Sequence, residues 1–280
     1  MTGKPPPPAL LQSLQVTAPS AVAETAIATV WRVRRADGTE AALKLYRGAD
    51  MINEEAGVRL AEALGGRGMA RIYATRPNAV LMEWLDGPPL SALVQSGEDD
   101  AASRALATLA RSLHTTRLDK PVSLHSLYRW CEALFALRFS AECRPATRRL
   151  MEAATRRAEH RLAHQAPPRP LHGDLHHDNV HRTPRGDIAF DAKGLIGDPA
   201  FELANAFRNP KGAERAVRDP ARIWARATIF AEITGISRQI LLEWAAIKCA
   251  LSIAWRAKGM LTSDSEIDLL ARLLHASRHV

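Results

Sequence analysis

The 280-residue sequence changes its apolar spacing once, near residue 86. Before that point, short alternating runs of apolar residues predict strands, whereas almost every later segment repeats its apolar residues at helical spacing. The change falls at Leu85-Asp86-Gly87-Pro88-Pro89, a turn-forming sequence. We therefore expect an α+β protein with a small antiparallel-sheet lobe and one helix over residues 10–85, and a larger helical lobe over residues 86–280.

The sheet lobe is predicted to be a meander followed by one helix and two more strands. Residues 36–39 form a hairpin turn between two strands. Residues 53–64 have helical spacing that ends at Gly65, a common helix stop. Residues 1–9 are rich in Pro and are expected to be an extended lead-in, because Pro supplies no backbone donor. The predicted strands cover Leu11–Val16, Ala28–Arg34, Ala41–Tyr46, residues 71–74 and residues 79–83.

The helical lobe contains one exception to its helical spacing. Residues 170–200 are rich in His, Asp, Gly and Pro and include a short apolar strand, Ile188–Phe190. Asp198-Pro199 then predicts a helix start, with Asp198 as the cap that supports the segment and Pro199 in the first turn. The predicted helices of this lobe cover apolar stripes at 102–113, 124–134 and 145–162, and the ranges 214–233, 237–258 and 264–277.

Cysteine and hydropathy patterns exclude several classes of protein. Three widely spaced Cys residues without a CxxC pair imply neither a disulfide framework nor a zinc site, and they favour a reducing cytoplasm. The N-terminus lacks the apolar stretch of a signal peptide. The most apolar window, Leu241–Trp255, is interrupted by Glu243 and Lys248, so no membrane segment is expected.

The net charge of +8, from 38 Lys and Arg against 30 Asp and Glu, favours anionic partners. Much of the excess lies between Arg144 and Arg161, within a predicted helix. Because this basic stretch has no interleaved aromatic residues, a solvated helix face explains it better than nucleic-acid binding. We therefore expect no nucleic-acid partner.

The His- and Asp-rich segment carries the groups that phosphoryl transfer needs. It reads Leu-His-Gly-Asp-Leu-His-His-Asp-Asn from Leu171 to Asn179, and Asp191 follows after a turn and a short strand. A carboxylate must orient the attacking hydroxyl, and hard oxygen ligands must hold Mg²⁺ on the nucleotide. Asp174 precedes Asn179 by the five positions typical of a kinase catalytic loop, and Asp191 is the second candidate metal ligand.

The histidines of this segment allow a second interpretation. His172, His176, His177 and His181 fall close together in the sequence and are candidate transition-metal ligands. No Cys accompanies them. We favour a structural role in which His172 fixes the loop through hydrogen bonds.

A phosphate-binding cation is expected from the sheet lobe. Ala-Ala-Leu-Lys-Leu-Tyr, from Ala41 to Tyr46, places Lys44 within an apolar strand and approximates the Val-Ala-Ile-Lys pattern of kinases. An acidic residue on the following helix is expected to pair with Lys44. Glu54 and Glu55 are both candidates, and Glu55 fits the later apolar rhythm better. The alternative is that Lys44 and the glutamates are ordinary solvent-facing groups.

The pattern His-Gly-Asp-x-His-x-x-Asn at 172–179, followed by Asp191, resembles the aminoglycoside phosphotransferase family, a branch of the protein-kinase-like fold. Segments 191–210 and 251–255 are similar to the streptomycin 6-phosphotransferase and hydroxyurea phosphotransferase group, and the likeness runs over about residues 25–260. The resemblance implies a bilobal protein-kinase-like fold that uses ATP and Mg²⁺. It also implies Asp174 as catalytic base, Asn179 and Asp191 as Mg²⁺ ligands, Lys44 as phosphate contact, and Glu83, Trp84 and Leu85 within the hinge that meets adenine.

The segment after Asp191 favours a small-molecule kinase over a protein kinase. Only six residues separate Asp191 from Asp198, which leaves no room for an activation segment. We therefore expect the helical lobe to enclose a small acceptor. One departure from the family is that residues 17–29 contain no Gly, although small side chains there still let backbone N–H groups approach a nucleotide. The candidate acceptor-pocket residues are Glu202, Glu243, Trp244 and Trp255.

These observations favour an ATP- and Mg²⁺-dependent O-phosphotransferase that acts on a hydroxyl of a small molecule, with an aminoglycoside such as streptomycin as the favoured acceptor. A metabolic kinase for a sugar, an amino alcohol or choline is one alternative. A non-catalytic kinase-like binding protein is the other. We expect a cytoplasmic monomer or homodimer without a membrane or nucleic-acid partner.

Overall fold

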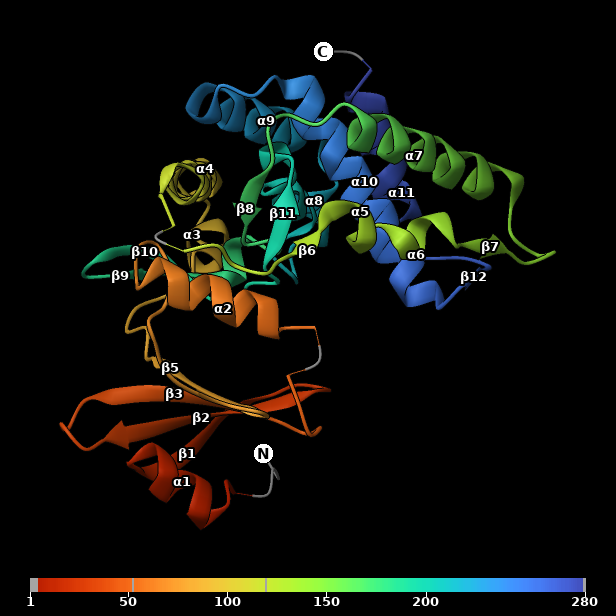
Figure 1. The fold of residues 1–280 in the computed structure, drawn as a ribbon. Helices are drawn as coiled ribbons and strands as arrows, with labels where there is room; N and C mark the ends of the chain where they lie inside the picture. The colour runs from red at the N-terminus through yellow and green to blue at the C-terminus, as the bar shows by residue number, and fades with distance from the viewer. Residues whose placement is uncertain (1–4, 52, 119, 279–280) are drawn as a thin grey trace.

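The computed structural model describes residues 5–51, 53–118 and 120–278 of the chain. Figure 1 shows a sheet at the N-terminal end and a group of helices at the other end, with helix α2 (Glu55–Leu64) lying between them. This arrangement confirms the predicted α+β class, in which an antiparallel sheet precedes a helical portion. None of the described helices combines the length and apolarity needed to cross a bilayer.

The sheet has five strands in the order β1-β2-β3-β5-β4, and every neighbouring pair is antiparallel. Leu43 of the central strand is fully buried, and it packs with Trp31, Val33 and Leu81 on one face of the sheet. The alternation of these apolar residues is what the sequence pattern of a half-buried strand predicts. The strand bounds are Val16–Glu24 for β1, Ala28–Arg35 for β2, Glu40–Tyr46 for β3, Ile72–Arg76 for β4 and Ala79–Glu83 for β5.

The prediction of a strand over Leu11–Val16 is wrong, because residues Pro8–Leu14 form helix α1. Pro8 is accepted in the first turn of a helix, where its missing N–H has no partner to lose. The helix then buries Leu14 and packs Leu10 and Leu11 against the sheet. Part of the expected lead-in, residues 1–4, lies outside the described residues, and Pro8 and Ala9 already belong to α1.

Helix α10 (Arg238–Ala257) runs through the centre of the helical portion, and it packs against α7, α9 and α11. The single helix predicted over residues 214–233 is interrupted, because Asp219 caps a new helix that starts at Pro220. The other helices are α3 (Ser91–Gln95), α4 (Asp99–Thr115), α5 (Leu127–Trp130), α6 (Glu132–Phe135), α7 (Pro145–Ala163), α8 (Glu214–Val217), α9 (Pro220–Thr234) and α11 (Ile267–Ala276).

Short strands hold the His- and Asp-rich segment in place. Strand β11 (Leu195–Gly197) pairs with β6 (His125–Ser126) on one side and with β8 (Arg169–Leu171) on the other. Strands β9 (Val180–Thr183) and β10 (Gly186–Ala189) form a hairpin. The loop that contains Asp174 therefore leaves β8 and enters β9, and Asp191 follows β10. The remaining short elements are β7 (Arg138–Phe139), β12 (Met260–Leu261) and the 3-10 turns η1 (His177–Asn179), η2 (Pro199–Phe201) and η3 (Ala204–Arg208).

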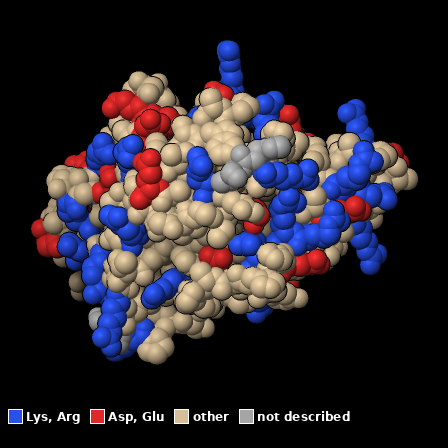
Figure 2. Space-filling view, turned by 90° about the horizontal axis from the view of Figure 1, so that it is seen from above, with Lys and Arg blue, Asp and Glu red and all other residues tan. Residues whose placement is uncertain are grey.

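The positive charge is distributed over the surface of the helical portion. Figure 2 shows that Lys and Arg cover more of the face seen from above than Asp and Glu do, with acidic side chains interspersed. On α7, Arg148, Arg149 and Arg156 are exposed, whereas Arg161 is partly covered and pairs with Glu243 at 3.0 Å. The basic stretch thus forms the outer face of a helix whose inner face is packed.

Candidate active site

The loop between β8 and β9 is shaped by Gly173 and held by buried hydrogen bonds. Gly173 has a φ of +80°, and a Cβ there would lie 2.7 Å from Leu195 Cγ, so only Gly fits without displacement. The His172 ring lies 2.9 Å from the carbonyl oxygen of Phe190 through Nε2, and its Nδ1 accepts the N–H of Asp174 at 3.3 Å. These contacts fix where the Asp174 carboxylate projects.

The Asp174 carboxylate is surrounded by donors. The amide of Asn205 donates to Asp174 Oδ1 at 2.7 Å, and the Lys248 ammonium lies 3.9 Å from the same oxygen. Burial opposes ionisation of this carboxylate, but the charges of Lys248, His176 and Lys193 together outweigh it and hold the pKa of Asp174 below its ordinary value. Asp174 is therefore a carboxylate at neutral pH, which is the form a proton acceptor requires.

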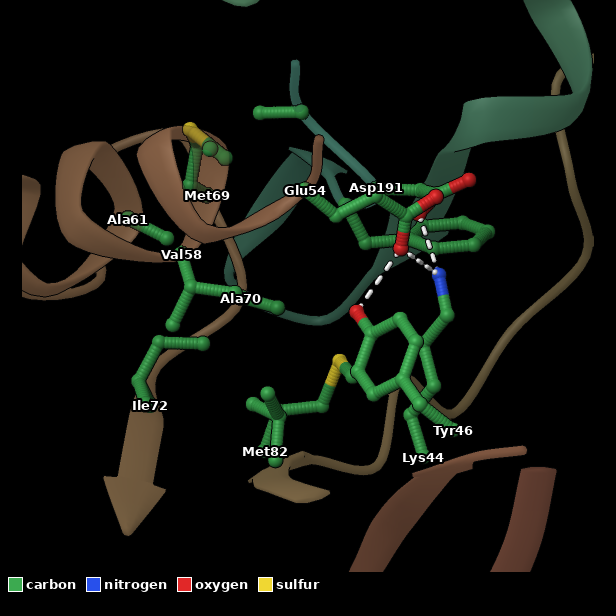
Figure 3. Close-up of a pocket in the computed structure, with 14 residues that line it drawn as sticks. Lys44, Tyr46, Glu54, Val58, Ala61, Met69, Ala70, Ile72, Met82 and Asp191 are labelled. Carbon is green, nitrogen blue, oxygen red and sulfur yellow. Dashed lines mark hydrogen bonds and ion pairs between the residues drawn. The ribbon is translucent and has the colours of Figure 1, made fainter. Parts of the chain in front are cut away.

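The Lys44 ammonium contacts two carboxylates, one from the residue before α2 and one from the segment after β10. Its Nζ lies 2.6 Å from Glu54 Oε2 and 2.6 Å from Asp191 Oδ1. Figure 3 shows these groups pointing toward one another, with the Tyr46 hydroxyl donating to Glu54 at 2.7 Å. Lys193 donates to the other oxygen of Glu54 at 2.9 Å. The four charges form one partly buried cluster.

The expectation that Glu55 pairs with Lys44 is wrong. Glu54 lies just before the helix and is only 5% exposed, whereas Glu55 is on the outer face of α2, where it pairs with Arg59. The apolar rhythm of a helix does not extend to the residue before its first turn, so the rhythm assigned the wrong glutamate.

Asp191 has a left-handed backbone with a φ of 62°, which turns its side chain toward Lys44. Burial alone would raise the pKa of Asp191, but the ammonium groups of Lys193 and Lys44 outweigh it and lower the pKa to about 2. Asn179 donates through Nδ2 to the Asp174 carbonyl at 3.0 Å, which leaves its side-chain oxygen available as a ligand. One ionised carboxylate and one amide oxygen fit Mg²⁺, which takes few protein ligands beside phosphates and water.

The histidines do not form a transition-metal site. No group of three or more His, Cys, Asp or Glu side chains suited to a metal ion occurs in the described part of the chain. His177 is buried against Arg226, 3.1 Å from its guanidinium, and burial holds the pKa of His177 well below its ordinary value. It is therefore a neutral packing residue.

A small cavity of about 30 Å³ lies behind Lys44, between β3, β5 and α2. It is too small for a nucleotide base and is lined mainly by apolar side chains such as Val58, Met69 and Met82. The predicted hinge follows it at the end of β5. There, Glu83 accepts hydrogen bonds from the Arg71 N–H and from Arg185. The Arg32 guanidinium lies over the Trp84 ring, 4.9 Å from its centroid. Leu85 is the next residue in the chain.

A larger cavity of about 540 Å³ opens beside Asp174. Its walls combine aromatic side chains with both signs of charge, and Trp130 meets Trp255 edge to face at 5.4 Å. A cavity of this size fits a ligand of drug-like dimensions. The residues that line it are Asn53, His125, Arg129, Trp130, Glu132, Ala133, Asp174, Lys193, Lys248 and Trp255.

Of the four residues predicted to line an acceptor pocket, Trp255 alone lines this cavity. Glu202 is buried and accepts the N–H groups of His172 and Gly173 at 2.8 and 2.9 Å, so it supports the loop instead. Trp244 is fully buried.

The remaining two candidates also have other partners. Trp244 donates through Nε1 to Asp198 at 3.0 Å, and Asp198 in turn accepts the N–H of Ala200. Asp198 thus caps η2 as predicted for a cap, although the turn is 3-10 and not α-helical. Glu243 pairs with Arg161.

Three polar residues of the site were not assigned a role from the sequence. Lys193 and Lys248 line the larger cavity, and Asn205 binds Asp174. Lys248 could have been identified from the sequence, because a charged residue in the most apolar window of a helix is costly to bury unless it has a partner. Nothing in the sequence singled out Asn205 or Lys193, since neither interrupts an apolar pattern.

Comparisons with known proteins show which family the chain belongs to. The family model described as aminoglycoside/hydroxyurea antibiotic resistance kinase matches residues 14–259. A streptomycin 3''-kinase of Klebsiella pneumoniae is 38% identical over 229 residues, which cover 80% of this chain and 82% of that protein. A hydroxyurea phosphotransferase of Kitasatospora aureofaciens is 32% identical over 268 residues, which cover 92% of this chain and 72% of that protein.

Solved structures share the fold. An aminoglycoside phosphotransferase from Streptomyces rimosus superimposes with a TM-score of 0.61 at 20% identity, covering 87% of this chain and 96% of that one. A choline/ethanolamine kinase family protein from Mesorhizobium loti gives a TM-score of 0.66 at 14% identity, covering 94% and 93%. These similarities confirm the expected protein-kinase-like fold.

Proposed function

The chain belongs to the family of aminoglycoside and hydroxyurea antibiotic resistance kinases, and on that premise we propose that it phosphorylates a hydroxyl of an aminoglycoside such as streptomycin, using ATP and Mg²⁺. The observation that carries the proposal is the position of Asp174. Its carboxylate lines a cavity of about 540 Å³, while Lys44 and Asp191 form an ion pair at the neighbouring junction of sheet and helices.

The residues divide the reaction between them. Asp174 accepts the proton of the acceptor hydroxyl as the hydroxyl oxygen forms a bond to the γ-phosphorus of ATP and the bond from that phosphorus to the β-phosphate oxygen breaks. Lys44 binds nucleotide phosphate, and Glu54 orients its ammonium. Asn179 and Asp191 would hold Mg²⁺, which neutralises phosphate charge when bound. ADP and the phosphate ester are the products.

The cavity suits a hydroxylated ring system. Trp130 and Trp255 offer apolar surface, and Glu132 offers a carboxylate to a cationic substituent. The names of the relatives describe streptomycin kinases of two kinds, 3'' and 6, so the likeness favours the substrate and not one hydroxyl. Because ATP is the donor, we place the reaction in the cytoplasm.

The choline alternative is less favoured by the cavity. A quaternary ammonium is recognised by free aromatic faces. Here the Lys248 ammonium already lies over the Trp255 ring, 4.7 Å from its centroid. A second cation on that face would meet like-charge repulsion.

The test is ADP release and product mass with a panel of acceptors. The panel contains streptomycin, other aminoglycosides, hydroxyurea, choline and simple polyols, each with Mg²⁺ and ATP. We expect saturable release of ADP with streptomycin and a product heavier by one phosphoryl group. Turnover of choline or a polyol in place of streptomycin would overturn the proposed acceptor. Nucleotide binding without turnover of any acceptor would favour the non-catalytic alternative.

A further inference from the structure

The two oxygens of the Asp174 carboxylate have different surroundings. Oδ1 accepts the Asn205 amide N–H at 2.7 Å and lies 3.9 Å from the Lys248 ammonium. Oδ2 accepts no hydrogen bond from the described residues, and its ion-pair contact is with His176 Nε2, at 4.0 Å. Among the described residues, the one hydrogen bond to this carboxylate, from Asn205, therefore engages Oδ1, and Oδ2 keeps its hydrogen-bonding capacity.

The orientation of the Asn205 amide is fixed by its neighbour. Arg208 donates through Nη1 to Asn205 Oδ1 at 2.9 Å. A guanidinium has donors and no acceptor, so the amide oxygen must face Arg208 and the NH₂ group must face Asp174. Arg208 is itself held by Glu266, which accepts two hydrogen bonds from Nη2, at 2.9 and 2.7 Å.

The backbone around Asn205 is also restrained. Asn205 lies on η3 and is only 5% exposed. Asn209 donates through its side chain to the Asn205 carbonyl at 2.8 Å, and the buried Arg226 donates to the next carbonyl, that of Ala206. These hydrogen bonds hold the backbone from which the Asn205 amide reaches Asp174.

We propose that Asn205 is a positioning residue for Asp174: it holds Oδ1 and thereby presents Oδ2 to the acceptor hydroxyl. This inference rests on the proposed function, in which Asp174 accepts the hydroxyl proton. Lys248 reinforces the division, since its charge lies on the Oδ1 side and its side chain is 5% exposed. A proton acceptor must sit within hydrogen-bond reach of the hydroxyl, so a rotated carboxylate would lose that geometry.

The variant Asn205→Asp tests this with little change in volume. It keeps an oxygen for Arg208 but replaces the donor with a second carboxylate beside Oδ1. We expect kcat for the acceptor to fall about 100-fold, the loss typical of a misplaced reacting group, with the KM for ATP unchanged within about twofold. The exposed variant Gln12→Glu on α1 adds the same charge and is expected to keep wild-type kinetics.

A stability measurement separates this inference from the proposed function, because it needs no turnover. Asn205→Asp places two carboxylates together and is expected to lower Tm. The exchange Asp174→Asn with Asn205→Asp restores one donor and one acceptor, so Tm should rise again although kcat does not recover. A double variant no more stable than Asn205→Asp alone, or Asn205→Asp with kcat within about threefold of wild type, would overturn the inference. Absence of wild-type turnover with a restored Tm would count against the proposed function alone.

Discussion

The Nζ atom of Lys44 lies 2.6 Å from Oδ1 of Asp191, an ion pair between residues 147 positions apart in the sequence. It joins strand β3 of the sheet to the segment that follows β10. Glu54, the residue just before α2, contacts the same ammonium. The groups that we propose to face the nucleotide, one set from the sheet and one from the segment after β10, are thus joined by ion pairs at one point.

Glu54→Gln is expected to weaken nucleotide use. The substitution removes the charge that accepts bonds from Lys44, Lys193 and Tyr46, and a hydrogen bond to a charged group contributes about 1.5–3 kcal/mol. We expect the KM for ATP to rise about 10- to 100-fold. Glu55→Gln is the matched control: its exposed pair with Arg59 contributes little, so kinetics should stay within about twofold. Equal effects of the two substitutions would contradict the assignment.

Gly57→Ala is expected to separate α2 from the segment after Asp191. A Cβ at position 57 would lie 1.8 Å from the carbonyl oxygen of Ala192, which is backbone and cannot rotate away. The helix must shift and carry Glu54 with it, so both Tm and kcat should fall. Gly48→Ala is the control, because the nearest atom to its Cβ would be 3.8 Å away. Thermal denaturation and ATP kinetics of both variants measure the difference, and an unchanged Gly57→Ala would refute the close contact.

The sequence predicted the elements whose apolar periodicity is strong. Strands β2, β3 and β5 and helix α7 follow from apolar spacing and turn chemistry, whereas Asp174, Asn179 and Asp191 were identified by their likeness to a kinase motif. Predictions failed where contacts with distant parts of the chain determine the secondary structure of a segment. The apolar run after the N-terminal prolines packs on the sheet as α1, a choice that local alternation does not distinguish from a strand.

Side-chain roles were harder to predict than elements. Glu202 looked like a pocket residue, but its carboxylate is directed at the backbone of the Asp174 loop. Trp244 points into the core, where it donates to Asp198. The residue before it on the same helix, Glu243, pairs with Arg161 instead. These outcomes depend on how a helix is rotated about its axis and on partners far away in the sequence. The spacing of residues within one segment gives no information on either.

Trp255→Leu is expected to affect the acceptor and not the nucleotide. Trp255 lines the larger cavity and forms its aromatic wall with Trp130. Losing that contact area should raise the KM for the acceptor about tenfold, with the KM for ATP unchanged. Tyr128→Leu, 61% exposed and outside the cavity lining, should leave both constants unaltered. Steady-state kinetics with each substrate varied in turn would show a shifted KM for ATP if the cavity were instead the nucleotide site.

Glu202→Gln is expected to destabilise the protein in a pH-dependent way. Burial opposes its ionisation, but His114 and the loop N–H groups lower the pKa of Glu202 below 4.5. A carboxyl whose pKa is lower in the folded state stabilises it fully above pH 4.5 and ceases to do so as the pH falls through the folded value. The Tm difference from wild type should therefore be largest near neutral pH and shrink below pH 4.5. A difference that grows on acidification would contradict this; Glu62→Gln, exposed on α2, is the control.

The central claim is that Asp174 accepts the hydroxyl proton of an acceptor bound beside it. The most direct measurement is transfer of the γ-phosphoryl group of ATP to streptomycin in a single turnover by wild type and by Asp174→Asn, with Mg²⁺-ATP binding measured on the same samples by calorimetry. We predict at least about a 100-fold lower transfer rate for Asp174→Asn, with nucleotide affinity retained. Transfer at the wild-type rate by Asp174→Asn would contradict the account.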